Sequence, residues 1–193
     1  MTQGATRERF VRATATLLQE RGYAGTGMND ILEASGAPRG SLYFHFPGGK
    51  AELAIEAVTQ SGGELCEVIR GVLEASSDLG EGITAITKFL GMQLVASDYK
   101  LGCPVAPLAI EGVDGALETA VAGAFDSWQG VIRARLVRAG HTPKRATELA
   151  TFALSAIEGA LLLCKVRRSV VPLELAAKEL SRVAEPKKKG ERS

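Results

Sequence analysis

The stretch from Thr26 to Lys50 reads T-G-M-N-D-I-L-E-A-S-G-A-P-R-G-S-L-Y-F-H-F-P-G-G-K, and it predicts two short helices joined by a turn. We expect Thr26 to cap the first helix, because its hydroxyl can accept from free first-turn amides. Gly36 can take the left-handed backbone that ends a helix. Pro38 suits the first position of the second helix, where a missing amide costs nothing. The stretch therefore predicts a helix-turn-helix.

The second predicted helix, residues 38–44, has an outward face that suits nucleic acid. Leu42 and Phe46 can pack inward, which leaves the outward set Arg39, Gly40, Ser41, Tyr43 and His45. Arginine pairs with phosphate or a guanine edge, hydroxyls donate to phosphate oxygens, and glycine lets the backbone come close. No acidic residue lies between positions 35 and 50, so the local field is positive. The alternative is a surface hairpin with ordinary solvated charges.

These residues resemble the DNA-binding signature of the TetR family of transcriptional repressors. The matching positions are Thr26, Asp30, Ile31, Arg39, Gly40, Ser41, Leu42, Tyr43, His45, Phe46, Pro47 and Lys50. The resemblance implies DNA contacts from Thr26, Arg39, Gly40, Ser41, Tyr43, Phe44, His45 and Lys50. Lys50 also opposes the dipole of the helix it begins, which a bound phosphate would explain. The chain departs from the family at Gly48-Gly49, where Phe-Pro-Ser-Lys is usual.

Composition bounds the remaining possibilities. Over 193 residues, no β-branched run alternates with polar residues, so we expect an all-α protein. The net charge of +1 means that DNA affinity must come from local clustering. Three widely spaced cysteines form no disulfide framework or metal pattern, which favours a reducing cytoplasm. We expect no signal peptide, no apolar run of membrane-spanning length, and no metal or cofactor.

The resemblance implies two domains: residues 1–47 form the DNA-binding domain, and residues 48–185 form a helical ligand-binding and dimerisation domain. We expect residues 186–193 to form a basic, disordered tail. Predicted body helices cover about 50–74, 83–97, 116–139, 143–166 and 173–184. Gly62-Gly63 marks a kink or hinge in the first of these, or a loop between two shorter helices.

The segment Leu101–Leu108, L-G-C-P-V-A-P-L, resembles a TetR branch that includes lincomycin-resistance and flavonoid-responsive repressors. The resemblance implies a regulator that binds a palindromic operator as a homodimer, through its last two long helices, and is released by a small hydrophobic effector. It also implies a mainly apolar pocket with few polar anchors. The residues that we expect to line it are Phe89, Met92, Gln93, Cys103, Phe125, Trp128, Phe152 and Glu158. The alternative for each is a filled core.

Other functions remain open at this stage. Cys103 precedes Pro104 at an expected helix start, where a lowered thiol pKa would suit a redox sensor or a thiol enzyme. A small buried apolar cysteine is the ordinary explanation. The chain shows no phosphate-cradling glycine motif and no nucleophile elbow, so we do not expect an enzyme. A plain helical interaction module is the third hypothesis.

Overall fold

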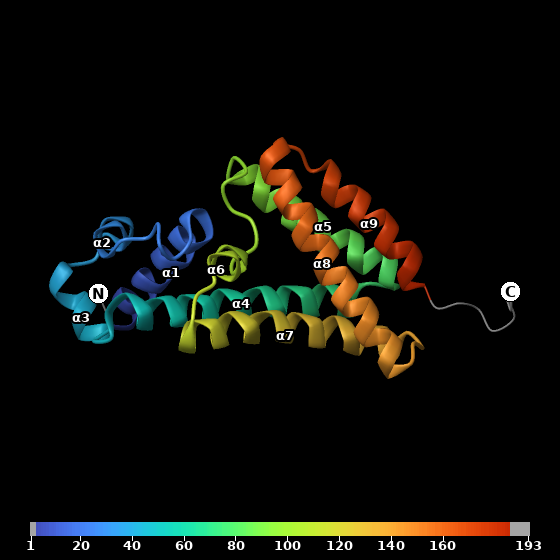
Figure 1. Ribbon diagram of the computed structural model, residues 1–193, viewed down its shortest axis with the longest axis horizontal. Helices are drawn as coiled ribbons and strands as arrows, with labels where there is room; N and C mark the ends of the chain where they lie inside the picture. Colours follow the sequence, from blue (N-terminus) through green and yellow to red (C-terminus); the bar gives the residue numbers. More distant parts are fainter. Residues whose placement is uncertain (1–2, 186–193) are drawn as a thin grey trace, which may run out of the picture. The chain divides into compact units, whose positions relative to one another are not determined.

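The computed structural model describes residues 3–185, and every regular element among them is an α-helix (Figure 1). The helices are α1 (Gln3–Arg21), α2 (Met28–Ser35), α3 (Arg39–His45), α4 (Gly49–Ala75), α5 (Leu79–Ala96), α6 (Ala106–Glu111), α7 (Gly115–Arg138), α8 (Pro143–Arg167) and α9 (Val171–Ala184). The all-α prediction is confirmed. The tail predicted at 186–193 lies outside the described residues.

The chain forms two compact units. Unit 1 comprises residues up to 64 together with 100–125, and unit 2 comprises residues 65–99 together with those from 126 onward. Unit 1 therefore holds α1 to α3 and α6 with the first parts of α4 and α7. Unit 2 holds α5, α8 and α9 with the remaining parts of α4 and α7.

Unit 1 is built around a small aromatic and aliphatic core that fixes the helix-turn-helix. Phe10 of α1 is fully buried, and its ring meets that of Phe46 edge-on, with centroids 6.3 Å apart. Ile31 of α2 and Leu42 of α3 are also fully buried. Since α1 packs against both α2 and α3, it acts as the base on which they rest.

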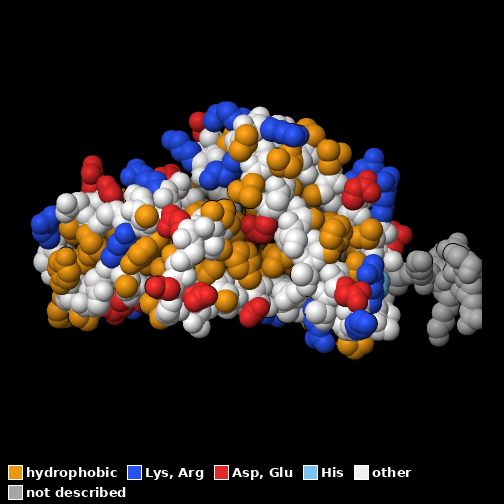
Figure 2. Space-filling model, in the orientation of Figure 1, with side chains coloured by type: hydrophobic (Ala, Val, Ile, Leu, Met, Phe, Trp, Pro, Cys, Tyr) orange, Lys and Arg blue, Asp and Glu red, His pale blue; other side chains and the backbone are white. Residues whose placement is uncertain are grey.

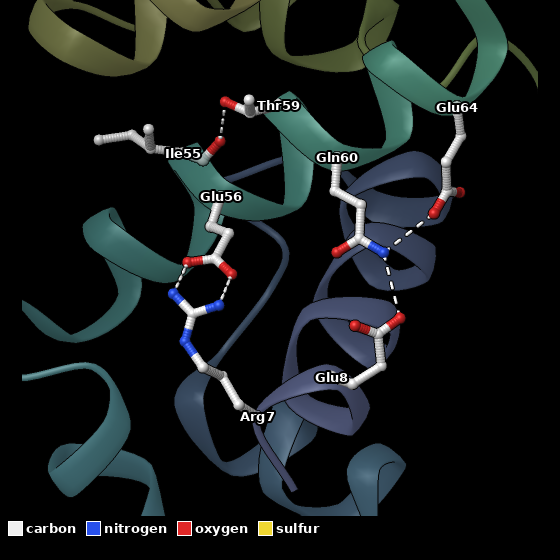
Figure 3. Close-up of polar contacts among 7 residues, drawn as sticks. All are labelled: Arg7, Glu8, Ile55, Glu56, Thr59, Gln60 and Glu64. Atoms are coloured by element: carbon white, nitrogen blue, oxygen red, sulfur yellow. Dashed lines mark hydrogen bonds and ion pairs between the residues drawn. The ribbon is translucent and has the colours of Figure 1, made fainter. Parts of the chain in front are cut away.

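Polar contacts join α1 to the first half of α4 (Figure 3). Arg7 forms a two-pronged ion pair with Glu56. Gln60 Nε2 donates to Glu8 Oε1 at 3.2 Å and to Glu64 Oε1 at 2.9 Å. Hydrogen bonds from Arg12, and then from Gln60, lower the pKa of Glu8. These contacts hold α1 against the first half of α4. The helix that supports the helix-turn-helix is therefore also attached to the long helix.

Unit 2 is a layer of helices in which α5 and α8 each pack against α9 (Figure 1). Its core cluster consists of Leu79, Leu136, Ala146, Leu149, Ala150 and Ala184. Asp78 caps α5 by accepting from the Glu81 amide at 2.8 Å. Thr142 caps α8 by accepting from the Arg145 amide at 3.3 Å, with Pro143 in the first turn.

The paired glycines of α4 lie inside one continuous helix. The alternative of a loop between two shorter helices is therefore wrong. A Cβ atom added at Gly62 would lie 2.8 Å from Ala124 Cβ, whereas one added at Gly63 would meet nothing within 4 Å. Gly62 is needed because α4 and α7 approach each other too closely there for a side chain.

Helix α8 is, within the described residues, the one helix long and apolar enough to cross a membrane by length and composition. The sequence was expected to contain no apolar run of membrane-spanning length, so α8 corrects that expectation, by length and composition only. The helix buries Leu149, Ala153 and Ile157 and exposes Phe152 and Leu162. A helix with one apolar face in a core and a second apolar face outside meets the same criterion as a membrane span.

Candidate nucleic-acid interface

The start of α2 differs from the prediction at Thr26. Gly27, not Thr26, is the N-cap, and its amide donates to Asp30 Oδ2 at 2.8 Å. Thr26 has no exposed surface, and its hydroxyl donates to the Gly22 carbonyl at 2.7 Å. The hydroxyl closes the turn after α1, so the prediction of a Thr26 cap is wrong. Its side chain also cannot reach a phosphate.

The turn between α2 and α3 follows the sequence closely. Gly36 has φ +56° and donates its amide to the Leu32 and Glu33 carbonyls, which ends α2 as predicted. Pro38 is the residue before α3 rather than its first residue. Arg9 Nε donates to the Ser35 carbonyl at 2.9 Å, so α1 also holds this turn.

Helix α3 is seven residues long, and one of its faces is exposed. Tyr43 is 60% exposed and Phe44 is 68% exposed, while Leu42 beneath them is fully buried. Space around Gly40 is open, since an added Cβ would meet nothing within 4 Å. Hydrophobic side chains reach the surface at this end of unit 1 (Figure 2). The helix thus offers an aromatic face and an accessible backbone without acidic side chains of its own.

Arg39 is exposed and oriented by a partner that the sequence analysis missed. Its guanidinium donates to Asn29 Oδ1 at 2.5 Å, a contact from α3 to α2. Since Asn29 lies on the exposed side of α2, the pair forms one polar edge of the surface. Arg7 of α1, by contrast, is engaged inside unit 1: it pairs with Glu56 and stacks on Phe46 with 5.1 Å to the centroid.

The remaining residues predicted to contact DNA are less free. The Ser41 hydroxyl donates to the Pro38 carbonyl at 2.6 Å, and Ser41 is half-buried. His45 is half-buried beside Phe44, with ring centroids 5.2 Å apart. Lys50 lies in the first turn of α4, and its ammonium sits 4.1 Å from the centre of the Tyr23 ring. The Tyr23 contact also escaped the sequence analysis, because the two residues are distant in the chain.

A groove between α5 and α9, within unit 2, is the candidate site for a ligand. Its volume is about 660 Å³, and its lining is Thr84, Thr87, Lys88, Gly91, Met92, Val95, Ala96, Val170, Leu173, Glu174, Ala177 and Lys178. Of the residues predicted to bind ligand, Met92 lines it. Trp128 is 1% exposed and fills core, and Phe152 is exposed on α8. The groove thus does not gather Phe89, Gln93, Cys103, Phe125, Trp128, Phe152 or Glu158.

Cys103 is not placed for thiol chemistry. It is buried and lies before α6 begins at Ala106, so the expectation of a helix start at Cys103 is wrong. Cys66 and Cys164 are buried as well, and burial raises the pKa of the Cys164 thiol. No group of three metal-ligating side chains occurs in the described part of the chain. No observation therefore favours the thiol-based alternative.

Two family models match the chain. The model described as bacterial regulatory proteins of the tetR family matches residues 10–57, which include α2 and α3. The model described as the C-terminal domain of LmrA/YxaF-like transcriptional regulators matches residues 80–179. Together they cover the helix-turn-helix and most of the remaining helices.

Whole-chain comparisons agree with these matches. The HTH-type transcriptional regulator LmrA of Bacillus subtilis is 39% identical over 175 residues, which cover 90% of this chain and 93% of LmrA. A TetR transcriptional regulator from Chloroflexus aurantiacus is 30% identical, with a TM-score of 0.75 and coverage of 93% and 94%. A cysteine mutant of the TetR-family regulator CifR, solved with 26-bp operator DNA, shares the fold at 23% identity, with a TM-score of 0.79 and coverage of 93% and 96%.

Proposed function

Because this chain belongs to the TetR family of bacterial regulatory proteins, we propose that it is a cytoplasmic repressor that binds a palindromic operator as a homodimer. A small hydrophobic, aromatic effector releases it from DNA. In this proposal residues 1–47 bind double-stranded DNA, and residues 48–185 bind the effector and the second copy. The protein performs no catalysis and needs no cofactor.

The exposed face of α3 carries the proposal. Arg39, Tyr43 and Phe44 project from a helix whose inner residue, Leu42, is fully buried. An arginine can bind a guanine edge or a phosphate, a phenol can donate to phosphate, and an apolar ring can contact a thymine methyl group. An exposed aromatic pair has no role in the core of unit 1, so a binding role accounts for it better than a packing role.

A dimer follows from the small size of α3 and from the surface of α8. One two-turn helix contacts too few bases for useful affinity, whereas a symmetric pair reaches two major grooves roughly 34–36 Å apart. The exposed residues Phe152, Ser155, Gly159, Leu162 and Val166 recur at spacings of three and four along α8. Exposed Val171, Leu175 and Val183 extend the apolar surface onto α9. Such a stripe is typical of a helix–helix interface between copies.

The groove between α5 and α9 is the proposed effector site. Its volume lies within the range of small-molecule pockets, and its walls are mainly apolar with Lys88, Glu174 and Lys178 among the lining. The effector acts by linkage: if it binds better to a body conformation that misplaces the two α3 helices, it must weaken DNA binding.

Fluorescence anisotropy with DNA selected from a random double-stranded pool tests the DNA-binding proposal. We expect tight binding that weakens steeply with salt, since lysine and arginine displace counterions from the phosphates. Arg39→Ala and Tyr43→Ala should each weaken binding by about tenfold or more, because one good base contact contributes roughly 1–3 kcal/mol.

Arg138→Ala is the matched control, since Arg138 is an exposed arginine on α7. It should leave the affinity unchanged. Circular dichroism melting should show that all three variants remain folded. Unchanged affinity in both α3 variants would contradict the proposal.

A further inference from the structure

Glu111, the last residue of α6, bonds to the segment that leads into the helix-turn-helix. Its Oε2 atom accepts from the Tyr23 amide at 2.9 Å and from the Ala24 amide at 3.0 Å. These amides belong to the α1–α2 link, which we define as residues 22–27. All of these residues are in unit 1. One carboxylate oxygen thus joins two segments almost ninety positions apart in sequence.

Gly22 leaves the space that the carboxylate occupies. A Cβ atom added at Gly22 would lie 1.6 Å from Glu111 Oε1, and the φ of Gly22 is +72°. The backbone conformation therefore favours glycine here, and a methyl group would displace the Glu111 carboxylate. The Gly22 amide still donates to the Leu18 carbonyl at 2.9 Å, so α1 ends normally at this point.

The position of Glu111 is unfavourable within its own helix. A carboxylate in the last turn faces the negative end of the helix dipole. Gly112, with φ +67°, ends α6 immediately afterwards. The dipole of α6 thus does not favour a glutamate at this position. The two charge-assisted bonds from backbone amides account for it instead.

The contacts continue from the link to a residue that is proposed to bind phosphate. The Tyr23 ring, whose backbone amide donates to Glu111, lies under the Lys50 ammonium at 4.1 Å. A cavity of about 570 Å³ lined by Tyr23, Ala24, Ile55 and Glu111, among others, adjoins this place. Gln19 adds a bond from α1 to the Gly102 carbonyl. The bonds to Glu111 thus hold the link at the edge of this cavity.

We propose that Glu111 is a positioning residue for DNA recognition: its carboxylate, seated over Gly22, holds the α1–α2 link and through Tyr23 sets the place of Lys50. Operator affinity then depends on α6 as well as on α3. This inference rests on the proposed function for its operator measurement, but the contact itself can be tested without DNA.

Hydrogen–deuterium exchange tests the contact directly on the full chain. In Glu111→Ala the Tyr23 and Ala24 amides should exchange about tenfold faster, because each loses a charged acceptor. Amides of α8 and α9 should be unaffected. Glu111→Gln, which keeps an oxygen acceptor, should restore most of the protection. The exposed Glu118 of α7 gives the matched control Glu118→Ala, which should exchange as the wild type does. Wild-type exchange at Tyr23 and Ala24 in Glu111→Ala would overturn the inference.

Operator affinity tests the positioning role. With DNA selected by the wild-type protein, Glu111→Ala should bind about tenfold more weakly, Glu111→Gln within about threefold of wild type, and Glu118→Ala as wild type. Gly22→Ala should weaken binding more in the wild-type background than in Glu111→Ala, where the clash is gone. Equal affinities for Glu111→Ala and wild type would overturn the inference. Failure of the wild-type protein to select any DNA would instead overturn the proposed function.

Discussion

At the residue scale, Gly62 and Gly63 are neighbours with opposite requirements. Gly62→Ala would place a methyl group 2.8 Å from Ala124 Cβ, so we expect it to lower the free energy of unfolding by about 1–3 kcal/mol through overpacking. Gly63→Ala would enter open space in the same helix and should raise stability by about 0.5–1 kcal/mol, because alanine restricts the unfolded chain.

Urea unfolding followed by circular dichroism measures both changes, and the glycine pair serves as its own control. The double substitution Gly62→Ala with Ala124→Gly should recover part of the loss by restoring the space. Stabilisation by both single alanines would contradict the close approach of α4 and α7. A hinge at this pair, one of the two readings of the sequence, remains a prediction.

Single residues also show where sequence reasoning about the site succeeded and failed. The exposure of Arg39 and Tyr43 and the burial of Leu42 could be predicted, because one helical turn fixes which residues share a face. The exposed Phe44 was not part of the predicted outward set. The role of Thr26 could not be predicted. Its hydroxyl could accept from an amide of the next helix or donate to the preceding Gly22 carbonyl, and it donates to Gly22. The Glu111 contact with Tyr23 was also out of reach, since no local pattern links α6 to the α1–α2 link.

At the scale of elements, the α5–α9 groove can be tested by filling it. Val95 is 55% exposed on its wall, so Val95→Trp should occupy the groove with little effect on the core. We expect the saturable binding of the aromatic probe 1-anilinonaphthalene-8-sulfonate, followed by its fluorescence, to weaken at least about fivefold, since binding there depends on apolar contact.

Val137→Trp on α7, at another exposed valine, is the control and should bind the probe as the wild type does. Unchanged probe affinity in Val95→Trp would place the effector site elsewhere.

The groove between α5 and α9 could not be predicted from the sequence. Periodicity identifies the apolar faces of α5 and α9 but not which two faces meet. The six-residue α6 was missed because Pro104 and Pro107 indicate a break in any helix there, although Pro107 fits the first turn of α6.

At the scale of the whole molecule, the stripe on α8 predicts the state of association. Leu162 is 50% exposed at the centre of this stripe. Leu162→Glu would bury one carboxylate from each copy in a symmetric interface, so the dimer dissociation constant should rise by at least about tenfold. Sedimentation velocity across a dilution series measures it.

Val137→Glu is the control, because Val137 is also an exposed aliphatic residue but lies on α7. It should leave the dimer intact. Operator affinity should fall in Leu162→Glu and not in the control, since only a pair of α3 helices reaches both half-sites. A monomeric wild-type protein, or an unchanged dimer in Leu162→Glu, would remove the basis for the palindromic operator.

The proposed homodimer, formed through the stripe of α8, has a consequence for how repression depends on the number of chains. Where the chains are mostly single, the amount of the pair grows with the square of the number of chains in the cell. Promoter occupancy then responds to protein number with a threshold rather than in proportion. A modest fall in synthesis, or dilution by cell growth, would therefore raise expression of the regulated gene more steeply than the same fall in a monomeric repressor would.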